Sequence, residues 1–355
     1  MNNDRIQEIL DLMEEARLDY FLISDPQSIA YCTGYYNDPH ERMFVFMISK
    51  HGNHTLFMND LFYLDHDLDV NIVWHKDGQD AIQTIVNEMH FPGRIGIDKN
   101  WASHFLLDLM KKLPDAKYIN ASPCVDLVRM KKDLQEQVLM IESSKINDAV
   151  MEEIIPFIQE GVTEKQLAKK LDELFFKHHS TCYGAIVAFG KNAADPHHEN
   201  DDTLLRKGDC VLIDMGCVYK GYCSDMTRTF FYEGILEEEI KVYEIVKKAN
   251  EAAEAMIKPG VKLSDIDKCA RKVISDEGYG KYFTHRLGHF IGRDVHEYGD
   301  VSSVNEMEVE EGMIFSIEPG IYLEGNFGVR VEDLVMVTKD GCQVLNSFTK
   351  DIYII

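Results

Sequence analysis

Long apolar runs, paired cysteines and an excess of positive charge are all missing from this 355-residue sequence. Every apolar stretch is much shorter than the roughly 20 residues of a membrane-spanning helix, and we expect neither a span nor an export signal. The eight cysteines are scattered without a C-x-x-C pair, which is typical of reduced cytoplasmic thiols. Lysine and arginine number 37 against 61 acidic residues, and the net charge of -24 disfavours nucleic-acid and anionic-membrane partners. We therefore expect a soluble, cytoplasmic protein that acts on small substrates.

The length and a change of pattern near residue 130 predict two domains, residues 1–130 and 131–355. In the first domain, helix-like segments alternate with strand-like runs such as YFLI (20–23) and MFVFMI (43–48). This alternation is typical of a small α/β domain whose sheet is covered by helices. A long helical pattern after Lys131 connects the domains and opens the second one.

The second domain contains a weak internal repeat. A helical segment followed by EGVTEKQLAKKLDELFF is answered about 99 residues later by another helical segment and PGVKLSDIDKCARKVIS. We expect Thr163 and Ser264 each to cap the helix that follows, and Gln166 lies at capping-box spacing from Thr163. Two helix-helix-strand units predict a pseudo-symmetric α/β domain with its functional site between the halves.

Acidic residues interrupt three apolar, strand-like runs of this second domain. Asp214 follows VLI, Glu318 follows FSI, and Glu332 precedes DLVMV, while Asp225 lies eleven residues after Asp214 beyond a Lys-Gly turn. An ionised carboxylate in a buried strand is costly unless a cation or hydrogen-bond donors compensate it. We therefore expect the four carboxylates to converge on one positively charged group.

Charge counting indicates a dinuclear metal centre. Two divalent ions balance four carboxylates, whereas one ion leaves a large negative charge in a partly buried site. The stretch THRLGHFIGRDVHE supplies His285, His289 and His296 as candidate imidazoles. Carboxylates with an imidazole and no thiolate favour Mn²⁺, Co²⁺, Fe²⁺ or Zn²⁺, and paired ions of this kind support hydrolysis.

Each of these residues also has an ordinary explanation when it is taken alone. A single acid is more often a helix cap or half of an ion pair, and His285 or His296 could be a hydrogen-bonded interior residue. The joint occurrence favours the metal centre, because the ordinary explanations would have to be separate for each strand. The sequence contains neither an H-E-x-x-H motif nor a P-loop.

Several stretches in order resemble the pita-bread metallopeptidase family, and within it the proline dipeptidase (prolidase, Xaa-Pro dipeptidase) branch. They are FGKNAADPHH, IDMGCVYKGYCSDMTRTF, THRLGHFIGRDVHE, IEPGIY and GVRVEDLVMVT. LDYFLISDPQSIAYCTGY resembles the amino-terminal domain of creatinase and prolidase relatives. The resemblance implies a small creatinase/prolidase-type α/β domain followed by a pseudo-symmetric pita-bread catalytic domain, and hence an α/β (α+β) protein.

The resemblance also implies a role for each metal ligand. Asp214 would chelate one ion, Asp225 and Glu332 would bridge both ions, and His289 and Glu318 would bind the other ion. We expect two divalent ions per subunit, with Mn²⁺ preferred and Co²⁺, Fe²⁺ or Zn²⁺ as alternatives.

The implied reaction is hydrolysis of Xaa-Pro dipeptides by a hydroxide that bridges the metals. Glu318 would accept the proton, and His197 and His296 would contact the substrate and handle protons. The scissile imide bond has no N–H, so the pocket can pack against the proline ring where other peptidases need an acceptor.

The resemblance further implies a homodimer in which the amino-terminal domain of one subunit covers the partner's site. Arg293 replaces an apolar residue of most relatives, and the loop 34–44 carries Asp38 and His40. We expect Asp38 or Glu41 to face Arg293 across the subunit boundary, while His40 or Arg42 contacts the substrate. The alternative is that this loop is an ordinary solvated turn.

Three other functions stay open at this point. The first is aminopeptidase P-like removal of the residue before proline from longer peptides, although the chain length favours a dipeptidase. The second is hydrolysis of another small amide on the same fold. The third is a metal-free binding protein, which retention of all five ligand positions disfavours.

Overall fold

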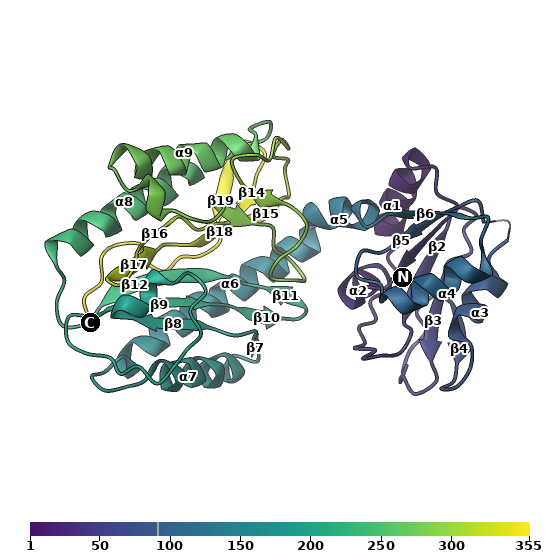
Figure 1. The fold of residues 1–355 in the computed structure, drawn as a ribbon, viewed down its shortest axis with the longest axis horizontal. Coiled ribbons are helices and arrows are strands. Elements are labelled where there is room, and N and C mark those ends of the chain that lie inside the picture. Colours follow the sequence, from purple (N-terminus) through teal and green to yellow (C-terminus); the bar gives the residue numbers. More distant parts are fainter. Residues whose placement is uncertain (91) are drawn as a thin grey trace. The chain divides into compact units, whose positions relative to one another are not determined.

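The computed structural model describes residues 1–90 and 92–355, which divide into two compact units (Figure 1). Unit 1 comprises Met1–Arg129, and unit 2 comprises Met130–Ile355. The α/β class predicted from the sequence is confirmed in both units. Every helix within the described residues is too short or too polar to cross a membrane.

Unit 1 is a six-stranded mixed sheet with helices on both faces. Its strands lie in the order β4-β3-β2-β1-β5-β6, with β1 antiparallel to β2 and parallel to β5. The strands are β1 (Tyr20–Ile23), β2 (Val45–Ser49), β3 (Thr55–Asn59), β4 (Asn71–His75), β5 (Arg94–Ile97) and β6 (Lys117–Asn120). The helices are α1 (Asn3–Glu15), α2 (Pro26–Thr33), α3 (Ala81–Glu88), α4 (Ser103–Lys112) and α5 (Pro123–Met130).

Strand β1 shows why helices cover both faces of this sheet. Phe21 and Ile23 pack in one apolar cluster with residues of α1, α2 and α5. Tyr20 and Leu22 pack in a second cluster with residues of α3 and α4. Because successive strand residues point to opposite faces, a continuous apolar run such as YFLI requires a core on each side.

Unit 2 contains four long helices and several short antiparallel sheets. The helices are α6 (Leu134–Ile154), α7 (Glu164–Lys177), α8 (Glu237–Glu254) and α9 (Leu263–Asp276), with 3₁₀ turns η1 (Ile155–Phe157), η2 (Gly190–Ala194) and η3 (Gly280–Tyr282). The first strands are β7 (Thr181–Cys182), β8 (Ile186–Phe189), β9 (Cys210–Met215), β10 (Cys217–Tyr219), β11 (Tyr222–Cys223) and β12 (Met226–Phe231). The later strands are β13 (Gly288–His289), β14 (Asp300–Val301), β15 (Ile314–Ile317), β16 (Gly320–Leu323), β17 (Phe327–Arg330), β18 (Asp333–Val337) and β19 (Cys342–Val344).

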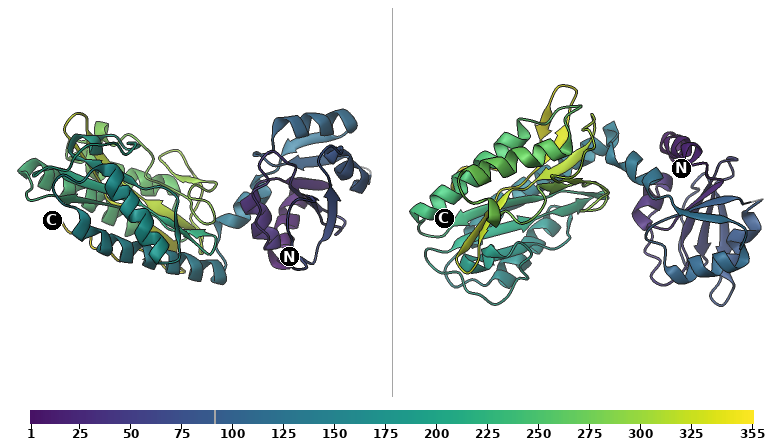
Figure 2. Two further views of the ribbon diagram at one scale, coloured as in Figure 1. Left: turned by 90° about the horizontal axis from the view of Figure 1, so that it is seen from below. Right: turned by 45° about the horizontal axis from the view of Figure 1, so that its top comes forward.

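The helices of unit 2 form two pairs on opposite sides of the strands (Figure 1, Figure 2). The pair α6 and α7 is followed by the sheet β12-β9-β8, and the pair α8 and α9 is followed by the sheet β15-β18-β19. The halves are joined where Thr229 of β12 exchanges hydrogen bonds with the backbone of Arg330 in β17. This arrangement places a seam between two similar halves.

The two predicted helix caps have different outcomes. Thr163 caps α7 in a complete capping box with Gln166, as predicted. The prediction for Ser264 was wrong, because α9 begins at Leu263 and Ser264 lies buried in its first turn. The backbone N–H groups of Leu263 and Ser264 donate to the carbonyls of Met307 and Asn305 instead. A neighbouring segment thus satisfies the helix terminus that a side-chain cap would otherwise serve.

Candidate metal centre

Three of the predicted ligands lie together at the seam of unit 2. Asp225 directly precedes β12, His289 ends β13, and Glu332 lies between β17 and β18. Their nearest ligand atoms all lie within 4.8 Å of one another. All three residues are 5% exposed or less, so this is a buried site with the spacing of a metal centre.

Backbone contacts define which nitrogen of His289 can bind a metal. Its Nδ1 lies 3.2 Å from the carbonyl oxygen of Phe290, which can only accept, so we assign the ring proton to Nδ1. The free Nε2 lies 3.6 Å from Oδ2 of Asp225 and 3.7 Å from Oε1 of Glu318. The imidazole therefore presents a lone pair toward the carboxylates.

Glu318 follows β15 and is the fourth residue of this group. The hydroxyl of Ser316 accepts from the His289 N–H at 3.0 Å and donates to Oε1 of Glu318 at 3.3 Å. Burial raises the pKa of Glu318 to about 7, and the charges of Asp225 and Asp214 add to the rise against the opposing effects of His289 and Arg330. A carboxyl group with such a pKa can exchange a proton near neutral pH.

Asp214, in β9, is held by a buried arginine. Nη2 of Arg330 donates to Oδ2 of Asp214 at 2.6 Å, and Arg330 is only 2% exposed. The same guanidinium donates to the hydroxyls of Thr227 and Tyr322, each at 3.0 Å. Burial nevertheless raises the pKa of Asp214 to about 6, because Arg330 offsets only part of the desolvation and Asp225 adds repulsion.

The carboxylates of the site are short of compensating positive charge. Burial raises the pKa of Glu332 well above its usual value, and Asp225, Glu318 and Asp214 add to the rise. Thr227 donates its hydroxyl proton to Oε2 of Glu332 at 2.6 Å. Clustered buried carboxylates with elevated pKa values are the expected state of a ligand set that divalent cations would neutralise. The oxygen-rich donor set with one imidazole therefore fits the predicted cations.

The predicted catalytic histidines lie at the edge of this cluster. The ring of His296 is exposed and stands perpendicular to that of His289, with 4.3 Å between the centroids. Desolvation lowers the pKa of His296 to about 4, and the nearby His289, Arg286 and His197 act in the same direction. His197 is also exposed, and its N–H donates to Oδ1 of Asp195.

Two other histidines have hydrogen-bonded, structural environments. His285 lies 2.8 Å from the hydroxyl of Tyr322 through Nε2 and 2.7 Å from the carbonyl of Arg286 through Nδ1. His198 lies 2.7 Å from Oε2 of Glu164, a buried carboxylate that also accepts the N–H of Phe189 at 2.9 Å. His198 and Glu164 thus hold the loop that carries His197.

The residues expected to meet across the subunit boundary, Arg293 and those of the loop 34–44, lie in both units. In unit 2 the guanidinium carbon of Arg293 lies 5.4 Å from the ring centroid of Tyr222. In unit 1 Asp38 and His40 are exposed, and the His40 N–H donates to Oδ1 of Asp38 at 3.0 Å. These two residues line a cavity of about 300 Å³ that Trp101 also borders. The pairing of Asp38 with Arg293 of the other subunit stays a prediction.

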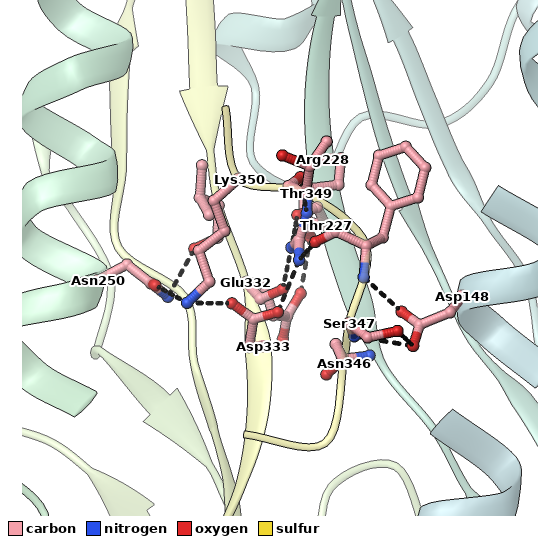
Figure 3. Close-up of polar contacts among 12 residues, drawn as sticks. Asp148, Thr227, Arg228, Asn250, Glu332, Asp333, Asn346, Ser347, Thr349 and Lys350 are labelled. Atoms are coloured by element: carbon pink, nitrogen blue, oxygen red, sulfur yellow. Dashed lines mark hydrogen bonds and ion pairs between the residues drawn. The ribbon is translucent and has the colours of Figure 1, made fainter. Parts of the chain in front are cut away.

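A buried ionic network lies behind Glu332 (Figure 3). Asp333 is fully buried and pairs with both Arg228 and Lys350, each at 2.7 Å. Arg228 also donates to the carbonyl of Glu332 at 2.6 Å, and Lys350 also pairs with Glu254 at 2.7 Å. Because adjacent residues of an extended strand point to opposite faces, Glu332 faces the metal site while Asp333 anchors the strand from behind.

Arg330, Thr227 and Arg228 were not identified from the sequence as site residues. Arg330 occupies the same face as Glu332, two positions earlier, in GVRVED. Thr227 and Arg228 lie two and three positions after Asp225 in SDMTRTF. The available signal was a charged residue inside an apolar strand, the same pattern that identified the acids.

Both units match known families. Residues 138–339 match the profile described as metallopeptidase family M24, and residues 5–131 match the creatinase/prolidase N-terminal domain. An uncharacterized peptidase of Staphylococcus aureus is 34% identical, and the match covers 98% of this chain and 99% of that protein.

Solved structures with the same fold include named dipeptidases. A dipeptidase from Pyrococcus horikoshii OT3 has a TM-score of 0.92 and 34% identity, with 99% of this chain and 100% of that chain covered. An Xaa-Pro dipeptidase from Bacillus anthracis has a TM-score of 0.92 and 28% identity, with 99% of both chains covered. These matches confirm the predicted order of a creatinase/prolidase-type domain and a pita-bread catalytic domain.

Proposed function

The chain belongs to metallopeptidase family M24, and we propose that it is an Xaa-Pro dipeptidase that releases free proline. The observation that carries the proposal is the buried group of Asp225, His289 and Glu332 within the region that matches the family. The similarity to an Xaa-Pro dipeptidase over the full length supports this choice of substrate.

We propose that two divalent ions are held by Asp214, Asp225, His289, Glu318 and Glu332. Two ions offset the charge of the four carboxylates, whose crowding and burial raise the pKa values of Asp214, Glu318 and Glu332, whereas one ion would leave an excess. Mn²⁺ is our preferred ion, and Co²⁺, Fe²⁺ or Zn²⁺ suit the same donors. When bound, such ions polarise a carbonyl group and lower the pKa of water.

The protein's own residues supply the proton transfers and the positioning. Glu318, whose Oε1 lies 3.7 Å from Nε2 of His289, accepts a proton from the attacking water at its carboxylate. His296 and His197 lie on the exposed side, where a substrate enters, and steady the tetrahedral oxygen or the leaving proline nitrogen. Arg330 keeps Asp214 in place through the 2.6 Å contact.

We also propose a cytoplasmic homodimer, whose amino-terminal unit covers the partner's site with the loop that carries Asp38 and His40. The loop is exposed and charged in this chain, which suits a polar lid. An unpaired charge in a partly closed pocket is costly, so pairing between Asp38 and Arg293 would make selection of the first residue depend on its charge.

Substrate assays on metal-free and reconstituted protein test the proposal. Chelated enzyme should be inactive, and Mn²⁺ should restore hydrolysis of Leu-Pro with free proline as a product. Faster cleavage of Leu-Pro-Gly than of Leu-Pro would favour the aminopeptidase P-like alternative. Absence of hydrolysis of both peptides, with two ions bound, would indicate another small amide as the substrate. Failure to bind two ions would favour the metal-free binding protein.

A further inference from the structure

A buried ion pair connects the start of unit 2 to the loop that carries His296. Nζ of Lys132 lies 2.9 Å from Oε2 of Glu297, and the two side chains are only 1% and 5% exposed. A buried ion pair is weak evidence for stability, but removal of one partner takes compensating charge away from a buried group that needs it. The geometry around Glu297 must therefore depend on Lys132.

The carboxylate of Glu297 organises its own loop. Oε1 accepts the backbone N–H of Arg293 at 2.9 Å, which closes the turn over residues 293–297. The backbone N–H of Glu297 donates to the carbonyl of Phe290 at 2.9 Å. A Cβ atom at Gly292 would lie 2.8 Å from both oxygens of Glu297, so the carboxylate rests directly on this glycine. These contacts fix the backbone immediately before His296.

The backbone of Lys132 is itself held by contacts with other parts of unit 2. Its backbone N–H donates to the carbonyl of Gly312 at 2.8 Å, and its carbonyl accepts from Nε2 of Gln137 at 2.8 Å. Lys131 forms a β-bridge with Met313. The ammonium group therefore approaches Glu297 from a fixed backbone, which lets it act as an anchor.

We propose that Lys132 is a positioning residue for His296. Its ammonium group neutralises Glu297, the Glu297 carboxylate fixes the loop, and the loop holds the His296 ring 4.3 Å from that of His289. Lys132 acts through Glu297 and makes no contribution of its own to the chemistry. The kinetic part of this inference rests on the proposed dipeptidase function.

The first test is a double-mutant cycle between Lys132→Met and His296→Ala in Mn²⁺-loaded enzyme. Lys132→Met should lower kcat for Leu-Pro by about 10-fold or more, because the loop loses its anchor, with metal content unchanged. In the His296→Ala background the same substitution should lower kcat by less than about 3-fold. An equal loss in both backgrounds would overturn the positioning role, since general destabilisation acts regardless of His296.

Two control variants separate the effect of the lost charge from that of the changed side-chain volume and from that of breaking an ion pair elsewhere in the chain. Lys132→Met combined with Glu297→Gln removes both charges and should recover part of the kcat that Lys132→Met loses. Lys99→Met breaks a 2.6 Å pair with the buried carboxylate of Asp126 in unit 1 and should leave kcat unchanged. A drop in kcat with Lys99→Met as large as with Lys132→Met would contradict the proposal.

A second readout needs no activity. Diethyl pyrocarbonate acylates exposed imidazoles, and mass spectrometry of the metal-free protein gives a rate for each histidine. Lys132→Met should change the acylation rate of His296 by about 3-fold or more, because the loop moves, while the exposed His66 keeps its rate. An unchanged His296 rate would refute the inference even if the chain proves to act on another substrate, and inactive wild-type enzyme with a changed rate would refute only the proposed substrate.

Discussion

Replacement of Asp333 by asparagine probes the network that supports Glu332 from behind. The carboxylate of Asp333 lies 2.7 Å from Nη2 of Arg228 and 2.7 Å from Nζ of Lys350. With Glu254, the network contains two basic and two acidic residues; Arg228 and Asp333 are buried, and Lys350 and Glu254 are partly exposed. Asparagine keeps the shape of the side chain but leaves one positive charge in excess.

The expected loss of stability follows from the burial of the ion pair between Asp333 and Arg228. Removal of one partner of a buried ion pair costs roughly 3–5 kcal/mol, which is below the total stability of about 5–15 kcal/mol of a typical protein. Arg228 keeps carbonyl acceptors at Thr227, Glu332, Phe348 and Thr349, so we expect a folded but weakened unit 2. At a urea slope of about 2 kcal/mol/M, the midpoint of unfolding should fall by about 1.5–2.5 M.

The two tryptophans allow the loss to be assigned to one unit. Trp74 and Trp101 both lie in unit 1, so tryptophan fluorescence follows unit 1 while far-ultraviolet circular dichroism follows both units. In chelated protein, Asp333→Asn should shift the dichroism transition and leave the fluorescence midpoint in place. Asp351→Asn, which breaks the exposed pair with Lys247, is the control and should shift neither midpoint by more than about 0.3 M. A dichroism shift below about 0.5 M for Asp333→Asn would refute the reasoning.

Five further substitutions test the site and the ionic network behind Glu332. Asp225→Asn should lower metal content at both positions, because a bridging ligand serves two ions; elemental analysis that finds two ions per subunit would contradict the bridge. His296→Ala should keep the metals and lower kcat about 100-fold; loss of metal in proportion to activity would make it a ligand. Arg293→Ser and Asp38→Ser should each change the ratios of kcat/KM among Asp-Pro, Arg-Pro and Leu-Pro. Constant ratios in both variants would mean that the loop 34–44 is an ordinary solvated turn. Burial raises the pKa of Glu254 from 4.5 to about 7. The folded state therefore binds this proton more tightly than the unfolded state, and the resulting stabilisation is complete below pH 4.5 and is lost as the pH rises through 7. The unfolding free energy of the unsubstituted protein should thus fall by about 3 kcal/mol between pH 4.5 and pH 7. Glu254→Gln should abolish this decrease, as measured by urea titration at each pH.

The acids of the candidate metal site could be singled out from the sequence because buried charge is costly in any fold. Asp214 and Glu332 interrupt apolar strands, and such an interruption has few physical explanations other than a cation or a set of donors. The structure brings Asp225, His289 and Glu332 within ligand distance, although they come from segments far apart in the chain. The sequence therefore indicated which residues needed a partner but contained no distances between them.

Helix boundaries were predictable where the cap is local. Thr163 and Gln166 satisfy the first turn of α7 through contacts three residues apart, which a sequence pattern can encode. At α9 the corresponding donors bind carbonyls of Asn305 and Met307, about 40 residues downstream, so no local pattern could show it. Ser264 has the right residue type, but the tertiary contact removed the need for its hydroxyl.

The basic residues of the site were missed for a related reason. An arginine in a strand is usually explained as a solvated surface residue, because its long side chain can reach water from many backbone positions. Arg330 instead lies inside the site beside Asp214, and Arg228 lies behind Glu332 with its guanidinium on Asp333. Arg330 thus contacts one of the acids within the site, and Arg228 holds the strand of Glu332 from behind. A pattern of acids in apolar strands should thus be searched together with neighbouring arginines, since these offset part of the same charge before any metal binds.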